Sequence, residues 1–184
     1  MNTLADRETH DILKIVDDEN YFPALHEHRK TVAVSLAAVT LCGQHLEYVP
    51  DRIIGREFEG REICRAALEA KDADCTILPY IPYPEVLKEG IRRFSAGTPA
   101  FVLYSIADIR DAEMAQDAVR ADAYCIQLVP AELLTKDLCR TALQSPNADE
   151  TVSKFVTERF PELKTEQKPE NEIDRQNTGV KMKL

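Results

Sequence analysis

The sequence predicts an all-α fold: a right-handed α-solenoid-like stack of about five helix-turn-helix repeats with an N-terminal capping helix. The first observation is a tetrad of largely apolar or small residues that recurs five times. Each tetrad has the spacing i, i+3, i+4, i+7, which marks one face of an α-helix. The tetrads are Val34-Ala37-Ala38-Leu41, Ile63-Ala66-Ala67-Ala70, Leu87-Gly90-Ile91-Phe94, Met114-Asp117-Ala118-Ala121 and Leu138-Thr141-Ala142-Ser145.

The second observation is the regular distance between the tetrads. Their first members lie 29, 24, 27 and 24 residues apart, a period typical of stacked helical repeats. Turn-favouring residues follow each tetrad, and a second, shorter apolar segment comes after every break. These segments are 46–49, 77–81, 101–106, 125–129 and 152–160. Each repeat is therefore expected to be a long helix, a tight turn and a shorter helix.

Three of the short segments close on a proline, at Pro50, Pro82 and Pro130. Because proline disfavours helical geometry in the residue before it, each short helix is expected to stop there. The third copy diverges most, with Lys88 and Arg92 where the other copies are apolar or small.

The repeats divide the chain into three parts. Residues 1–30, with Ile12 and Ile15 on one face, are expected to form an N-terminal cap. Residues 31–161 form the predicted helical repeat domain. Residues 162–184 have very little to bury and are expected to be a polar, flexible C-terminal tail.

Composition narrows the class of protein. The chain has 184 residues, with 32 acids against 23 Lys plus Arg and a net charge of -9. This charge opposes binding to nucleic acid, and it favours a basic protein partner, although solubility alone also accounts for it. No apolar run is long enough to span a bilayer, and no signal peptide is recognisable. Five cysteines suit a reducing compartment, so we expect a cytoplasmic protein with no membrane partner.

Similar motifs recur in two long helices, as Ile63-Cys64-x-x-Ala67-Leu68 and Leu138-Cys139-x-x-Ala142-Leu143. The first short segment reads Leu46-Glu47-Tyr48-Val49-Pro50. Together these motifs resemble the tandem helical repeats of unknown function that are common in gut Bacteroidetes proteins. The consensus of that family runs roughly Ile-Cys-x-x-Ala-Val, a turn, then Leu-x-Tyr-Val-Pro. The resemblance covers about residues 32–160 and implies the fold type, without any catalytic or ligand-binding motif.

Cysteine and histidine side chains supply the ligand types of a metal site. Cys42-x-x-His45, with Cys64 and Cys75, lacks the two close pairs of a structural zinc site. Cys64 also occupies a repeat position where a small residue is needed for packing. The imidazoles of His26-Glu27-His28 would need a third ligand from elsewhere, so we interpret this segment as a polar connector. We predict no metal site and no cofactor.

Three acidic groups could act as paired carboxylates: Asp17-Asp18-Glu19, Asp72-Ala73-Asp74, and Asp108 with Asp111. All lie at expected helix ends, where Asp commonly caps a helix or forms a turn. With six glycines in the chain, a phosphate-binding loop is also hard to build. We therefore predict no catalytic residue and no enzyme.

Aromatic residues mark the predicted partner-binding site. Tyr80, Tyr83 and Tyr104 lie in or beside the short segments and would anchor a peptide or helix if they line a groove. The alternative is that they pack between adjacent repeats with only their hydroxyls at the surface. In the tail, a short docking peptide is predicted from Val180, Met182 and Leu184.

These observations support three hypotheses for function. The first is a non-catalytic protein-protein interaction module, in the form of an inhibitor, immunity or adaptor protein for a basic partner. The second is a structural component of a larger assembly, tethered by the C-terminal tail. The third, with the weakest support, is an enzyme whose groove uses acids or His45 with Cys42.

Overall fold

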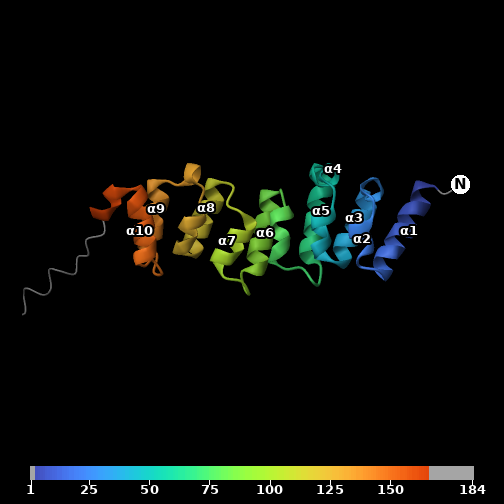
Figure 1. Ribbon diagram of the computed structural model, residues 1–184, viewed down its shortest axis with the longest axis horizontal. Coiled ribbons are helices and arrows are strands. Elements are labelled where there is room, and N and C mark those ends of the chain that lie inside the picture. The colour runs from blue at the N-terminus through green and yellow to red at the C-terminus, as the bar shows by residue number, and fades with distance from the viewer. Residues whose placement is uncertain (1–2, 166–184) are drawn as a thin grey trace, which may run out of the picture. The chain divides into compact units, whose positions relative to one another are not determined.

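The computed structural model describes residues 3–165, and this part of the chain is helical with no strand (Figure 1). The predicted all-α class is therefore confirmed. The chain divides into two compact units, Met1–Ile109 and Arg110–Leu184, which we call the first and the second unit. The predicted division into cap, repeat domain and tail stays a prediction.

The first unit holds the predicted capping segment and the first three repeats. Long helices α3, α5 and α6 contain the first three tetrads, except that Ala70 is the residue just after α5, and each helix packs on the next along the chain. The helices are α1 (Leu4–Asp17), α2 (Tyr21–Ala24), η1 (Glu27–Arg29), α3 (Val32–Leu41), η2 (Gly43–Tyr48), α4 (Asp51–Ile54), α5 (Glu57–Glu69), η3 (Cys75–Tyr80), α6 (Pro84–Phe94) and α7 (Ala100–Ala107), where η denotes a 3-10 helix.

The second unit holds the last two repeats. Its helices are α8 (Ala112–Ala121), η4 (Ala123–Leu128), η5 (Ala131–Leu133), α9 (Lys136–Gln144), α10 (Glu150–Arg159) and η6 (Pro161–Thr165). Side chains just before the long helices cap them. Asp111 accepts a hydrogen bond from the Met114 N–H (2.7 Å), and Thr135 accepts one from the Leu138 N–H (3.2 Å). These caps satisfy backbone donors that a helix start leaves free.

The short segments that precede a proline are 3-10 helices with one common ending. The backbone N–H of Val49 donates to Leu46 (3.2 Å), and Ile81 donates to Leu78 in the same way (3.2 Å). In the second unit, Val129 donates to the Ile126 carbonyl (3.4 Å). The other two second segments are α-helices, α7 and α10, and α10 is followed by Phe160 and Pro161. The predicted helix stops are thus present.

The buried stripe of the long helices differs from the tetrad. In α3, α5, α6 and α8 it occupies positions i, i+1, i+4 and i+5 of each helix. These residues are Val34, Ser35, Ala38 and Val39; Ile63, Cys64, Ala67 and Leu68; Val86, Leu87, Gly90 and Ile91; and Met114, Ala115, Ala118 and Val119. The buried stripe is therefore shifted to the i+1 side of the tetrad, and Leu41, a tetrad member, is 50% exposed.

Position i+4 of this stripe always holds a very small residue. It is Ala38, Ala67, Ala118 or Ala142, and Gly90 in α6. A Cβ at Gly90 would lie 2.6 Å from the Leu78 side chain, so neighbouring elements approach the helix backbone closely here. The burial pattern also places the start of the third stripe at Val86, one residue before the Leu87 of the tetrad.

Candidate functional site

Two exposed tyrosines end the 3-10 helices η2 and η3 of the first unit. Tyr48 is 41% exposed and Tyr80 is 40% exposed. They hold the same place in their repeats, because each precedes a buried residue and then a proline. The two 3-10 helices pack on each other, so these rings belong to one surface.

Polar contacts join the two helices at this surface. The Tyr80 hydroxyl donates a hydrogen bond to the Glu47 carboxylate, which raises the pKa of Tyr80 above its usual value. The Thr76 hydroxyl donates to the side-chain oxygen of Gln44 (2.9 Å). We call the surface formed by Gln44, Glu47, Tyr48, Thr76 and Tyr80 the tyrosine face.

A buried lysine supports the tyrosine face from behind. Lys30 is 7% exposed, and its ammonium donates to the Tyr48 carbonyl (3.1 Å). The same Nζ lies 4.9 Å from the Phe22 ring centroid and 5.8 Å from that of Tyr48. Burial lowers the pKa of Lys30. These contacts hold the end of η2 in one position, which reduces the entropy that Tyr48 would lose on binding.

The structure places the predicted tyrosines in different surroundings. Tyr83 is half-buried, and its hydroxyl donates to the carbonyls of Ile54 and Arg56. Tyr104 is 7% exposed. Among the three, Tyr80 lies on the tyrosine face, together with the unpredicted Tyr48.

The other predicted partner-binding residues, Val180, Met182 and Leu184, lie outside the described part of the chain. The predicted set as a whole stays a prediction. Tyr48 was missed because its segment was interpreted only as a helix stop. Its alignment with Tyr80, each before an apolar residue and a proline, was the signal in the sequence.

A cavity of about 490 Å³ lies beside Cys42 and His45, between α1 and the ends of α3 and α5. His45 is 5% exposed, and both ring nitrogens face backbone carbonyls. Nε2 lies 2.9 Å from the Glu19 oxygen, and Nδ1 lies 3.2 Å from the Ala38 oxygen. Because both ring nitrogens face carbonyl oxygens of the chain itself, neither nitrogen is directed at a substrate or metal.

The thiol of Cys42 is stabilised in its protonated form. Burial raises its pKa, and a hydrogen bond to the Asp72 carboxylate raises it further. Burial alone acts to raise the pKa of Asp72, but hydrogen bonds from Cys42 and from the Gly43 N–H together hold it below its usual value. A thiol of this kind is a poor nucleophile, because the thiolate is the reactive species.

The remaining candidate ligands are separate or engaged in local contacts. His26 and His28 form a hydrogen bond through their Nδ1 atoms (2.7 Å). Asp74 caps η3 and Asp111 caps α8, as the sequence predicts for acids at helix ends. Within residues 3–165, no group of three or more His, Cys, Asp or Glu side chains is placed to hold a metal ion.

Within the part of the chain that the structure describes, the fold is all-helical, with recurring short 3-10 helices. Comparison with protein-family models, curated protein sequences and solved structures finds no match. The resemblance to the Bacteroidetes repeats therefore stays a prediction. No helix in the described part of the chain combines the length and apolar character needed to cross a membrane.

Proposed function

We propose that this chain is a non-catalytic protein-protein interaction module that binds a basic protein partner through its tyrosine face. The observation that carries the proposal is the pair of exposed, equivalent tyrosines, Tyr48 and Tyr80, joined through Glu47. Tyrosine is enriched among residues that dominate binding energy, because a rigid ring offers a large contact area and a polar tip.

We further propose that the repeats form a right-handed, α-solenoid-like stack of about five copies with α1 as the cap. Recurring burial at four positions, the small residue at i+4 and the common ending of the 3-10 helices support this proposal. Within the first unit, α5 packs on η2 of the copy before it, and α6 packs on η3 in the same way. Repeat folds of this kind expose extended binding surfaces.

Charge supports a basic partner. The chain carries a net charge of -9, which steers a basic protein toward it over a distance of about one Debye length. At the tyrosine face, Glu47 is exposed and can form an ion pair with an Arg or Lys of the partner. An inhibitor, immunity or adaptor protein would use these features without a reaction of its own.

The test is quantitative affinity capture from the native cell, followed by binding measurements with the identified partner. We expect Tyr48→Ala and Tyr80→Ala each to weaken binding by about 2 kcal/mol, roughly 30-fold in Kd. The matched control is Phe58→Ala, because Phe58 is 78% exposed in the same unit and lies outside the tyrosine face. Binding should also weaken as salt rises.

A chain that lacks residues 166–184, and so retains all the described helices, separates this proposal from tethering by the tail. If the tyrosine face binds, the truncated chain retains its partner. Loss of the partner on truncation, with both tyrosine variants unaffected, would overturn the proposal. Equal weakening by the Tyr48, Tyr80 and Phe58 variants would also contradict it, because the effect would then not depend on the tyrosine face.

A further inference from the structure

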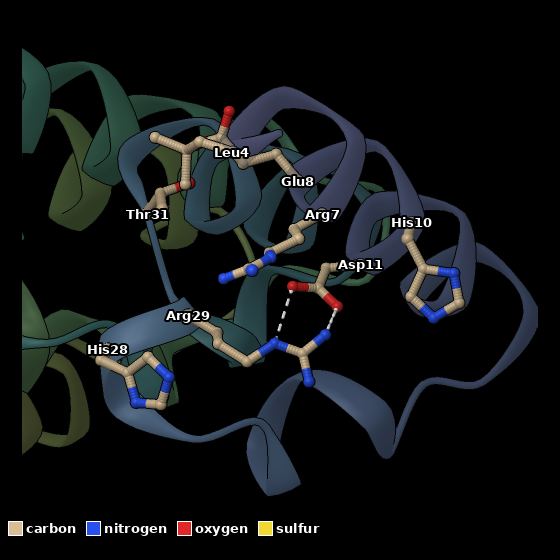
Figure 2. Close-up of a pocket in the computed structure, with 8 residues that line it drawn as sticks. All are labelled: Leu4, Arg7, Glu8, His10, Asp11, His28, Arg29 and Thr31. Atoms are coloured by element: carbon tan, nitrogen blue, oxygen red, sulfur yellow. Dashed lines mark hydrogen bonds and ion pairs between the residues drawn. The ribbon is translucent and has the colours of Figure 1, made fainter. Parts of the chain in front are cut away.

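Two cavities lie beside α1, and the charges around them differ. The cavity between α1 and the segment around η1 has a volume of about 380 Å³ (Figure 2). In its lining, Arg29 donates from Nε to Asp11 Oδ2 (3.2 Å) and from Nη2 to Oδ1. The exposed Arg7 forms no side-chain hydrogen bond or ion pair within residues 3–165, and Glu8 offsets its charge. The two acids and two arginines balance, so this lining attracts neither sign of charge.

The other cavity, of about 490 Å³, has exposed apolar side chains in its lining. Val16 of α1 is 60% exposed, and Leu41 of α3 is 50% exposed. Leu13, which is 61% exposed, lies one turn before Val16 on α1. Apolar side chains gathered around a hollow are typical of a surface that a partner buries. We call this cavity, which Glu19 and Asp72 also line, the α1–α3 cavity.

Acidic side chains predominate around the α1–α3 cavity. Glu19 and Asp72 line it, and the exposed Asp17 and Asp18 directly precede Glu19 in the chain. Lys71 also lines the cavity and supplies an opposing charge. Four acids against one lysine favour an apolar ligand that carries positive charge.

Residues 176–184 combine these two properties. They contain two lysines and no acid, in a chain with a net charge of -9. Residues 166–175, in contrast, contain four acids and two basic residues. Val180, Met182 and Leu184 alternate with Lys181 and Lys183. In an extended segment, such alternation places the apolar side chains on one side, where they can enter a cavity, and the long lysine side chains can still reach acids at its edge.

We propose that residues 180–184 of a second copy of this chain, which lie outside the described residues, bind in the α1–α3 cavity. Their apolar side chains cover Val16 and Leu41, and their lysines form ion pairs with Glu19 and Asp72. The segment belongs to the second unit and the cavity to the first, so a neighbouring molecule can supply the segment whatever the arrangement of the two units within one chain. Because the two contacting surfaces differ, the contact is heterologous and copies associate head to tail. The contact involves no residue of the tyrosine face and does not depend on the proposed partner.

Sedimentation equilibrium of the full chain measures this association. We expect reversible, concentration-dependent association that is lost in the triple variant Val180→Ser/Met182→Ser/Leu184→Ser. Leu41→Ser should weaken it roughly tenfold in Kd, because burial of a large apolar side chain is lost. The matched control is Phe58→Ser, since Phe58 is 78% exposed and does not line the cavity. A full chain that stays monomeric at millimolar concentration overturns the proposal.

A mixture of two variants separates the head-to-tail contact from other self-association. The Leu41→Ser chain keeps an intact C-terminal segment, and the triple variant keeps an intact cavity. Mixed in equal amounts, the two should form a one-to-one complex, although each associates weakly or not at all by itself. Association that Leu41→Ser weakens but that persists in the triple variant would indicate contact between two cavities, and it would overturn the proposal.

A charge variant tests the ion pairs. We expect Lys183→Gln to weaken association, because one of the two lysines beside the cavity acids is lost. The matched control is Lys168→Gln, which removes the same charge from the part of the tail that precedes the binding segment. Equal weakening by the two variants would show an effect of net charge alone and would overturn the assigned contact.

Discussion

The carboxylate of Asp72 accepts a hydrogen bond of 3.1 Å from the backbone N–H of Gly43, 29 residues earlier in the chain. The second unit repeats this relationship, because the Asn147 side-chain oxygen accepts from the Ala123 N–H at 3.3 Å. In both cases, a loop residue of one repeat caps the first residue of the 3-10 helix in the repeat before it. Adjacent repeats within each unit are thus joined by side-chain hydrogen bonds as well as by apolar packing.

Removal of either loop side chain should destabilise its unit. We expect Asp72→Ala and Asn147→Ala each to lower the free energy of unfolding by about 1–3 kcal/mol, because a buried N–H loses its partner. Urea denaturation monitored by circular dichroism measures the change. Asp17→Ala is the control, since Asp17 is exposed and its side chain forms no hydrogen bond or ion pair within the described residues. An equal effect of the three variants would contradict this explanation.

The Asp11–Arg29 ion pair should contribute strongly to the stability of the first unit. In Arg29→Gln, the 2% exposed Asp11 carboxylate keeps only the Tyr21 hydroxyl, so we expect a loss of about 3 kcal/mol. Arg7→Gln should leave stability unchanged. The double variant Asp11→Asn/Arg29→Gln should recover part of the loss, because no charge is then left unpaired. If the loss in the double variant equals the sum of the losses in Asp11→Asn and Arg29→Gln measured singly, Asp11 and Arg29 are not coupled.

The protein should be more stable with alanine in place of Ser35. Ser35 is 0% exposed, and its hydroxyl has no hydrogen-bond partner among the described residues. The equivalent position in α8 is Ala115. We expect Ser35→Ala to raise the free energy of unfolding by about 1 kcal/mol, because it removes an unsatisfied buried polar group. The exposed Ser105, whose hydroxyl donates to the Val102 carbonyl (2.8 Å), is the control, and its alanine variant should change little.

Alanine substitutions at two glycines should have different effects on the stability of the protein. A Cβ at Gly60 would lie 2.1 Å from the Ile54 carbonyl oxygen and 2.3 Å from the Tyr83 hydroxyl. We therefore expect Gly60→Ala to lower the thermal midpoint, with a loss of about 1–3 kcal/mol or more from overpacking. Gly97→Ala meets nothing within 4 Å and should be neutral or slightly stabilising. Similar midpoints for the two variants would contradict the close packing at Gly60.

Three buried cysteines should resist alkylation in the folded protein. Burial raises the pKa of Cys64 and Cys125 to about 12 and that of Cys139 to about 11. At neutral or mildly alkaline pH these thiols stay protonated and are shielded from reagent, so their reaction with iodoacetamide should be slow. Unfolding in urea should make all three react. Peptide mapping by mass spectrometry measures the extent, and rapid labelling of Cys64 in the folded chain would contradict its burial.

One part of the candidate site can be predicted from the sequence, and another part cannot. The motifs before Pro50 and Pro82 place Tyr48 and Tyr80 at one repeat position, and that alignment can be made by inspection. The opposite surroundings of Tyr80 and Tyr104 cannot be predicted in this way. Tyr80 ends a 3-10 helix at the surface, whereas Tyr104 lies inside α7 and faces the core.

The hydrogen-bond partners of His45 could not be predicted from the sequence either. The sequence shows it three residues after Cys42, which suggests a ligand pair. In the structure its nitrogens face carbonyl oxygens of Glu19 and Ala38, and one of these belongs to a segment 26 residues away. Hydrogen-bond partners at such separations depend on how the segments pack.

The sequence by itself determined that the chain is helical, that long helices recur with a common spacing, and that short helices stop before Pro50, Pro82 and Pro130. These properties follow from local periodicity and from the geometry of proline. Only the tertiary structure decided which side of each long helix is buried and that the third stripe starts at Val86. It also decided which tyrosines are exposed, because these properties depend on the neighbours that each helix packs against.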